Sequence, residues 1–369
     1  MNPTMRAMRV HTAGGHFVMD TIDRPELQRP TDVLVEVKAS GVVPNLRNVI
    51  SHYGDKSYLT VPDLPAIYGL DTAGIVAKVG AAVTDIRVGD RVYINPGRSC
   101  GSCHACRTGE PINCKAFTFQ GYFGFGPQSK GIYKQYPYGG FSEYATAPAD
   151  GLIKLPDAVS FQQAARFGYL GTAYSGLLKA GVRAGRTLMV IGATGTLGLG
   201  TVQIARAMGA TRILCVARNP QLLAKLQALD PQRIRTFSYG SGSLTDWAQE
   251  QTEGLGVDAV IDAIAPGASH QVTLDGIHSL RRGGRLVEIG AMTDPLPVQL
   301  HEMMCAQVSI MGSLWFSVAE GQDLAAMAEA GTLDLSVFDQ HCFRLEEANE
   351  ALAEAEKRAG GFVNVVITQ

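Results

Sequence analysis

The chain has 369 residues, of which 46% are hydrophobic and 18% charged, and its formal net charge is −2. This composition is typical of a soluble globular protein and excludes the disordered and fibrous classes. The length indicates two domains. Lys and Arg are spread along the chain, which argues against a nucleic-acid or membrane-surface partner.

The distribution of apolar residues and cysteines predicts the compartment. No apolar run follows Arg6 and Arg9, so we expect no signal peptide. Glycines interrupt the apolar stretch around 187–205, which argues against a membrane span. Four of the seven cysteines lie between 100 and 114, a pattern that fits a reducing environment. The sequence therefore predicts a cytoplasmic protein.

Residues 1 to about 160 contain short alternating strands between Gly/Pro turns, as at 33–37 and 91–94. This pattern predicts a β-rich domain, which we place on the substrate side. Its least regular segment, 116–141, is rich in Tyr, Phe, Gly and Pro. Two interpretations remain open: a surface loop packed on its own aromatic rings, or a lip of the substrate cleft.

Four cysteines form the strongest local motif: Cys100, Cys103, Cys106 and, after seven residues, Cys114. Four thiolates at this spacing can surround one tetrahedral Zn²⁺, and a closed four-sulfur shell leaves no position for substrate. We therefore expect one structural zinc. The alternative is a set of free thiols or two disulfides.

From about residue 160 strands and helices alternate, which predicts a doubly wound parallel sheet with helices on both faces. The expected strands are 187–191, 212–217, 257–263, 285–290 and 308–315, and the expected helices are 198–208, 220–229 and 270–281. A polar helix at 345–357 and an apolar strand at 362–367 follow. We expect this tail to fold back onto the first domain.

The stretch Thr187–Gly198 reads as strand, tight turn and helix, with glycines at 192, 195 and 198. Such a loop lets a dinucleotide diphosphate approach main-chain N–H groups at a helix N-terminus. A glycine-rich hairpin is the alternative, and the downstream strand–helix alternation favours the dinucleotide. The residues expected to bind the cofactor are Thr172, Gly192, Thr194, Gly195, Thr196, Leu197, Gly198, Arg218, Asn219 and Gly290.

Together with the glycine loop and the cysteines, Val88-Gly89-Asp90-Arg91-Val92 makes the chain resemble the zinc-containing medium-chain dehydrogenase/reductase superfamily over essentially its whole length. The resemblance implies an α/β protein: a GroES-like β-rich catalytic domain at 1–160 and 321–369, with its zinc lobe at about 95–116, and a Rossmann domain at 161–320. It also implies a cleft between them, and a homodimer or dimer of dimers joined through 308–315.

Most alcohol dehydrogenases of that superfamily hold a second, catalytic zinc, but this chain has Val43, Leu70 and Gly168 at the three ligand positions. None of these residues can bind a metal. The surrounding stretches, 41–44 and 69–74, instead resemble the quinone oxidoreductase and enoyl reductase branch. We therefore expect a reaction site without a catalytic metal.

The end of the second Rossmann strand bears on the choice of cofactor. NAD-dependent enzymes place an acid there for the ribose 2′-OH, whereas this chain has Ala217 followed by Arg218. A guanidinium matches a phosphate, which favours NADPH over NADH. The alternative is that Arg218 is a solvated residue stacked on adenine.

Three residues are candidates for proton transfer: Asn45 at the position of a relay Ser or Thr, Asp71 in place of a Glu, and Tyr169 beside the lost ligand. Each has a structural alternative: a turn, a cap or ion pair, and core packing, respectively. His52 and Tyr53 are weaker candidates.

These features predict an NADPH-dependent oxidoreductase that moves hydride to a carbonyl or an activated C=C or C=N bond of a small molecule. Positioning and polar groups would replace a catalytic metal. Two alternatives remain open: a zinc-dependent alcohol dehydrogenase with atypical ligands, and a non-catalytic dinucleotide-binding redox sensor.

Overall fold

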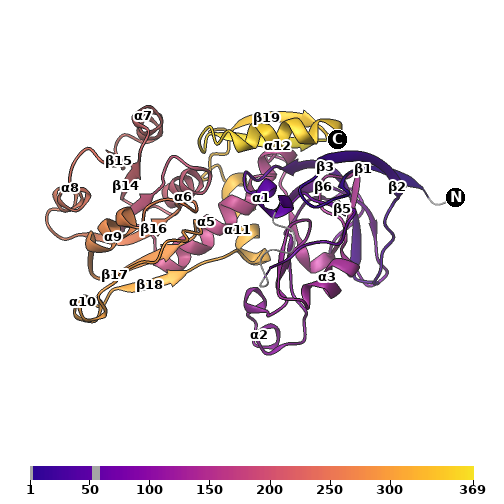
Figure 1. The fold of residues 1–369 in the computed structure, drawn as a ribbon, viewed down its shortest axis with the longest axis horizontal. Coiled ribbons are helices and arrows are strands. Elements are labelled where there is room, and N and C mark those ends of the chain that lie inside the picture. Colours follow the sequence, from indigo (N-terminus) through magenta and orange to yellow (C-terminus); the bar gives the residue numbers. More distant parts are fainter. Residues whose placement is uncertain (1–2, 52–58) are drawn as a thin grey trace.

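The computed structural model describes residues 3–51 and 59–369. The ribbon separates into two parts, a strand-rich part that contains both ends of the chain and a part built on a parallel sheet with helices (Figure 1). We call them the strand-rich part and the parallel-sheet part. None of the helices described is long and apolar enough to cross a lipid bilayer.

The main sheet of the strand-rich part has β3 and β6 at its centre, paired antiparallel. The strand order is β12-β7-β6-β3-β20-β19, with β11 also paired to β3. The strands are β3 (Asp32–Gly41), β6 (Asp71–Val79), β7 (Arg91–Ile94), β11 (Tyr144–Pro148), β12 (Leu152–Lys154), β19 (Asp339–Arg344) and β20 (Val363–Thr368). The tail at 339–369 thus completes a sheet begun near the other end of the chain.

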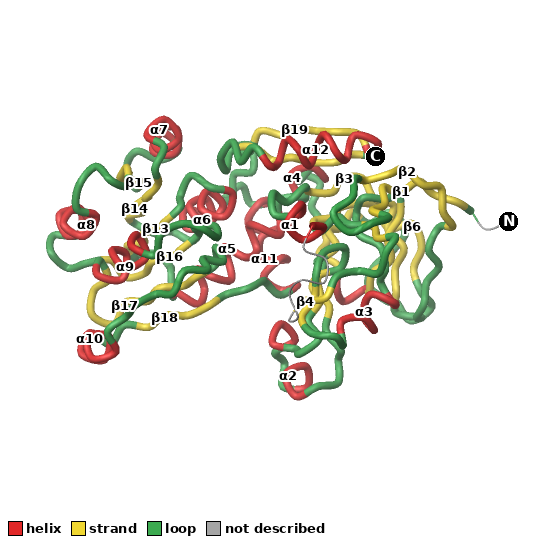
Figure 2. The backbone as a smooth tube through the Cα atoms, viewed as in Figure 1, coloured by secondary structure: helices red, strands yellow, loops and turns green. Residues whose placement is uncertain are grey.

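Two smaller sheets and short helices surround this main sheet (Figure 2). The smaller sheets have the orders β2-β1-β5 and β4-β10-β9-β8. Their strands are β1 (Thr4–Val10), β2 (Phe17–Asp23), β4 (Leu59–Thr60), β5 (Ala66–Ile67), β8 (Gly97–Arg98), β9 (Thr118–Phe119) and β10 (Gly124–Phe125). The helices are α1 (Leu46–Ser51), α2 (His104–Arg107), α3 (Ser129–Gln135), α4 (Phe161–Ala164) and α12 (Ala348–Glu356), with 3₁₀ turns at Pro111–Asn113, Ala149–Gly151 and Leu345–Glu347.

The second part contains a six-stranded, fully parallel sheet in the order β15-β14-β13-β16-β17-β18. Its strands are β13 (Thr187–Ile191), β14 (Arg212–Ala217), β15 (Ile234–Ser238), β16 (Val257–Asp262), β17 (Leu280–Glu288) and β18 (Ser309–Gly312). Its helices are α5 (Phe167–Ala180), α6 (Thr196–Ala207), α7 (Pro220–Ala228), α8 (Leu244–Gln251), α9 (Gln271–His278), α10 (Leu300–Ala306) and α11 (Val318–Glu329).

Alternate residues of the central strand β13 pack on opposite faces of this sheet. Leu188 and Val190 belong to the core that includes Leu199 of α6, whereas Met189 and Ile191 belong to the core that includes Leu244 of α8. Both faces are therefore covered, as a buried parallel sheet requires. The predicted α/β fold, with a Rossmann-type sheet beside a β-rich part, is confirmed.

Several predicted boundaries were wrong. Strand β18 is shorter than the expected 308–315, and the expected helix at 345–357 begins as a 3₁₀ turn. Strand β17 starts five residues early, because Gly283 and Gly284 interrupt the apolar run that marks a strand. The prediction omitted strand β15 and helices α5, α8, α10 and α11. Edge strand β15 buries only Ile234 and Phe237, too few residues to give a continuous apolar signal.

The segment 116–141 carries β9, β10 and α3, and its rings pack on one another. Phe119 makes edge-to-face contacts with Phe117, Phe123 and Trp315, at centroid distances of 5.1, 5.2 and 4.8 Å. The rings therefore pack partly on one another, as in the first interpretation, but Phe117 and Phe119 are buried and Trp315 lies outside the segment, so the segment is not a surface loop packed only on itself. One of its residues, Tyr122, nevertheless contacts Asn45, a candidate catalytic residue.

Candidate active site

The glycine loop between β13 and α6 is shaped for close approach. Gly192 has a φ of +76°, which only glycine adopts without strain. A Cβ on Gly198 would lie 2.1 Å from the Gly192 carbonyl oxygen, so a side chain there would break the turn. A Cβ on Gly195 would have one heavy atom within 4 Å, which leaves that side of the loop open. Loop and helix N-terminus therefore fit a dinucleotide diphosphate.

A pocket of about 450 Å³, counted with the open solvent at its mouth, lies where the two parts meet. Its wall includes Val43, Asp71 and Tyr169 and also Thr196, the first residue of α6. The pocket thus joins two predicted catalytic residues to the loop predicted to bind the cofactor. Thr196 is the one predicted cofactor residue in this wall; the other predicted residues are not part of it, namely Asn45, Thr172, Gly192, Thr194, Gly195, Leu197, Gly198, Arg218, Asn219 and Gly290.

Asp71, the first residue of β6, is 1% exposed. The hydroxyl of Tyr93 on the neighbouring strand β7 donates a hydrogen bond of 2.6 Å to Asp71 Oδ1. Burial raises the pKa of Asp71 from 3.8 to about 7, against the opposing effects of Tyr93, the Gly168 main chain and Arg166. Asp71 is therefore a carboxyl group that titrates near neutral pH at the pocket wall.

The three positions of the absent metal ligands lie near this carboxyl group: Gly168 faces it, Leu70 precedes Asp71 in the chain, and Val43 lines the same pocket. Val43 and Leu70 are 5% and 8% exposed and carry no donor atom. A Cβ on Gly168 would lie 2.1 Å from Asp71 Oδ1, so the carboxyl group takes the space that a side chain there would need. The donor set at this point is one carboxylate, which does not fit a three-ligand catalytic zinc.

Asn45 contacts Tyr122, a tyrosine that the sequence did not single out. Asn45 Nδ2 donates to the Tyr122 hydroxyl at 3.3 Å. Burial is the main cause that raises the pKa of both Tyr122 and Tyr169, with smaller contributions from the charge of Asp71. His52 and Tyr53 lie outside the described residues.

Two arginines that the sequence did not single out also form the pocket wall. Arg166, 3% exposed, donates from Nη2 to the carbonyl oxygens of Thr196 and Gly361 at 3.1 and 2.8 Å. Its guanidinium also lies over the Tyr169 ring, 5.3 Å from the centroid. Arg358 is exposed and has a φ of +48°. A buried arginine between helix termini leaves no periodic signal, so only the fold could reveal it.

At the end of β14, Ala217 is buried and Arg218 exposed. Among the described residues no carboxylate pairs with the Arg218 guanidinium, which leaves it free to meet a ligand. The Asn219 side chain caps α7 instead, accepting from the main-chain N–H groups of Gln221 and Leu222 at 3.0 and 3.1 Å.

The remaining predicted cofactor residues shape the backbone. Thr172 Oγ1 donates to the Gly168 carbonyl at 2.8 Å, and a Cβ on Gly290 would lie 2.1 Å from the Ile264 carbonyl oxygen. Leu197 is half-buried in the first turn of α6, while Thr194 accepts a 2.8 Å hydrogen bond at its carbonyl from Gly361 N.

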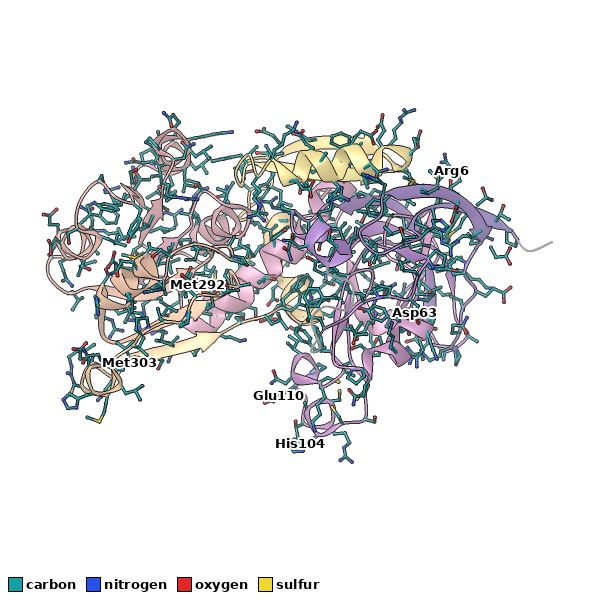
Figure 3. All side chains as sticks on the ribbon, in the orientation of Figure 1. Arg6, Asp63, His104, Glu110, Met292 and Met303 are labelled. Atoms are coloured by element: carbon teal, nitrogen blue, oxygen red, sulfur yellow. The ribbon has the colours of Figure 1, made fainter. Side chains whose placement is uncertain are left out.

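The four clustered cysteines lie in a small lobe around α2, where Figure 3 labels His104 and Glu110. All four sulfur atoms lie within 4.8 Å of one another, and Cys103 and Cys106 are 3.5 Å apart. Two ligands of a tetrahedral zinc with 2.3 Å bonds stand roughly 3.8 Å apart. The cluster therefore fits one Zn²⁺, and in the described part of the chain no other group of three or more candidate ligands occurs.

Comparisons with known proteins agree with this geometry. Residues 29–157 match the alcohol dehydrogenase GroES-like domain, and residues 196–330 match the zinc-binding dehydrogenase family. The probable D-xylulose reductase A of Neosartorya fischeri is 30% identical over 343 residues, covering 91% of this chain and 89% of its own. D-xylulose reductase A of Aspergillus niger is 28% identical over 366 residues, covering 95% of each chain.

Solved structures give the same fold. An NAD-dependent alcohol dehydrogenase superposes with a TM-score of 0.81 at 26% identity, covering both chains fully. A putative zinc-binding dehydrogenase of Sinorhizobium meliloti bound to NADP has a TM-score of 0.82 at 23% identity and full coverage of both chains, which shows the fold alone. These matches support a nicotinamide cofactor and zinc. The chain therefore belongs to the medium-chain dehydrogenase/reductase superfamily and is an alcohol dehydrogenase-like oxidoreductase.

Proposed function

We propose that this oxidoreductase transfers hydride from NADPH to a carbonyl or activated C=C or C=N bond of a small molecule, without a catalytic metal. The observation that carries the proposal is the Asp71 carboxyl group beside Gly168, with the apolar Val43 and Leu70 at the other two ligand positions. One carboxyl group that titrates near pH 7 supplies a proton when protonated, and a single such group does not build a zinc site.

The cofactor would lie along the glycine loop, with its diphosphate at the N-terminus of α6 and Arg358 across the pocket. When bound, it supplies the hydride. Arg218 would meet the ribose 2′-phosphate, and Ala217 removes the carboxylate that would repel it. These two residues are the basis for preferring NADPH to NADH.

The chain's own residues would hold the proton and position the acceptor. Asp71 keeps a proton on its carboxyl group below about pH 7, while Tyr93 fixes the orientation of that group. The Tyr169 ring is held over the Arg166 guanidinium. Arg166 also bonds to Gly361 in the tail and Thr196 in the glycine loop, which keeps the two walls of the pocket in register.

The domain division, assembly and location are part of the proposal. We assign 1–160 with 321–369 to the catalytic domain and 161–320 to the Rossmann domain, so that α4 follows the first boundary directly and α11 spans the second. Strand β18 is the edge of its sheet, and nearby Leu300 and Met304 on α10 are among the exposed large apolar residues, so a second copy would cover this border and form a homodimer or dimer of dimers. The cysteine usage favours the cytoplasm.

The experiment is a screen of NADPH and NADH oxidation against aldehydes, ketones, enones, quinones and imines. D-xylulose belongs in the panel because two relatives carry it in their names. We expect NADPH-dependent turnover with an acceptor of this set by protein that holds one zinc per chain. Turnover that requires a second zinc favours the alcohol dehydrogenase alternative, and nucleotide binding without turnover of any acceptor favours the redox-sensor alternative.

A further inference from the structure

Tyr122 presents an unused hydrogen-bond donor next to the metal-free site. Its hydroxyl accepts a hydrogen bond from Asn45 Nδ2 at 3.3 Å, and Asn45 Oδ1 in turn accepts from Asn48 Nδ2 at 2.7 Å. The two hydrogen bonds thus run from Asn48 to Asn45 and from Asn45 to Tyr122, and the Tyr122 hydroxyl acts only as an acceptor in them. In the described part of the chain no acceptor takes the Tyr122 O–H, so the phenol has one proton left to give.

The turn that carries Tyr122 is packed against the segment that precedes Asp71. Gly121 has a φ of +70°, and a Cβ there would lie 2.6 Å from the Gly69 carbonyl oxygen. Gly69 stands two residues before Asp71 and next to Leu70. The backbone contact therefore places Tyr122 beside the position where a catalytic zinc would need its second ligand.

A buried polar network holds this turn in place. Arg98 donates from Nε and Nη2 to Gln120 Oε1 at 3.1 and 2.7 Å, and Gln120 Nε2 donates to the carbonyl oxygens of Tyr138 and Thr146, both at 2.8 Å. Arg98 and Gln120 are both buried. This network fixes the turn that carries the Tyr122 phenol. A fixed position is what a preorganised hydrogen-bond donor requires.

We propose that the Tyr122 hydroxyl is the hydrogen-bond donor that receives the acceptor oxygen of the substrate, with Asn45 as its positioning residue. The proposal rests on the function proposed above and gives Tyr122 the part of an oxyanion-stabilising group. Tyr122 is 7% exposed, so the bond forms away from bulk water, where it stabilises developing negative charge most. Burial also keeps the pKa of Tyr122 above its ordinary value, so the phenol stays protonated.

The test compares Tyr122→Phe with Tyr133→Phe. Tyr133 lies in the same segment and is also buried, and its hydroxyl donates to the Thr60 carbonyl at 3.3 Å instead of facing Asn45. The first measurement is the NADPH dissociation constant of each protein, which should stay the same. The second is the binding of N-cyclohexylformamide to each NADPH complex, because this probe offers a carbonyl oxygen and resists hydride addition.

Loss of the Tyr122 hydroxyl should weaken formamide binding about tenfold, because the formamide carbonyl oxygen is then buried without a hydrogen-bond donor. With an acceptor found in the screen, kcat should fall about 100-fold. Tyr133→Phe should match the wild type in both. Formamide affinity in Tyr122→Phe within twofold of the wild type, an equal loss in Tyr133→Phe, or a wild-type complex that does not bind the formamide overturns the proposal. Failure of the wild type to bind NADPH would instead overturn the proposed function.

Discussion

Replacing Asp71 with Asn keeps the shape of the side chain and removes its titration. The carboxyl group has a pKa of about 7 against an ordinary value of 3.8, a difference of about three units. Each unit corresponds to 1.36 kcal/mol, so ionising the buried group costs the fold about 4 kcal/mol. The Asn oxygen can still accept the Tyr93 hydrogen bond.

The sign of the stability effect follows from proton binding. Between about pH 4 and pH 7 the native state keeps the Asp71 proton and the unfolded state has lost it, so the free energy of unfolding falls as pH rises. Below about pH 4 Asp71 is protonated in both states and does not reduce the free energy of unfolding. Above about pH 7 the full cost of its burial as a carboxylate reduces that free energy. Urea unfolding should therefore show Asp71→Asn gaining up to about 4 kcal/mol on the wild type between these two pH values.

The same substitution should remove the proton donor. We expect wild-type kcat/KM for reduction to decline above about pH 7, and Asp71→Asn to lose a factor of about 10² to 10⁴ at low pH with no inflection near 7. Tyr93→Phe is the matched variant. Because the Tyr93 hydrogen bond lowers the pKa of Asp71, its removal should move the inflection to higher pH. An Asp71→Asn profile that superimposes on the wild type refutes the reasoning.

Four further outcomes are expected. Elemental analysis of dialysed protein should give one zinc per chain, and Cys103→Ser should lower the melting temperature without changing the chemical step; two firmly held zincs contradict this. Light scattering at micromolar concentration should give at least a dimer, and a monomer argues against pairing through β18. Arg218→Ala should weaken NADPH about ten- to a hundredfold, equivalent to about 1.5–3 kcal/mol, and leave NADH nearly unchanged, while Ala217→Asp should turn preference toward NADH; equal weakening by Arg218→Ala makes Arg218 a surface residue. Arg358→Ala should weaken the binding of NADPH and NADH alike, because both carry the diphosphate. A selective loss of NADPH binding would contradict the placement of Arg358 at the diphosphate.

The parts of the fold that follow from the sequence are those with strong local patterns. Strands at 91–94 and 212–217 have the predicted bounds because each is a short apolar run between polar turns. Edge strand β15 escaped prediction because only one of its faces is buried and Arg235 and Thr236 interrupt the run. An apolar sequence pattern marks residues that are buried, and an edge strand such as β15 has few buried residues.

The candidate site divides in the same way. Asp71 could be named from its position beside Leu70, and the structure puts it in the pocket wall. Tyr93 and Tyr122 could not be named from the sequence. Tyr93 matters through its contact with Asp71, 22 residues away, and Tyr122 through its contact with Asn45, 77 residues away. Sequence motifs identify residues that share a turn with the chemistry, whereas partners brought together by strand pairing, as with Tyr93, or by the packing of distant loops, as with Tyr122, emerge only from the fold.

The pairing of β20 with β3 has a consequence during synthesis. Val366 pairs with Gly41, so 325 residues separate the two partners. At 5–20 residues per second, a ribosome takes roughly 15 to 65 s to make the intervening chain. Throughout that time β3 lacks one of its neighbours, and within it every strand of the parallel sheet, residues 187–312, is made before β20. The parallel sheet can therefore form first, and the last translated strand closes the substrate-side sheet.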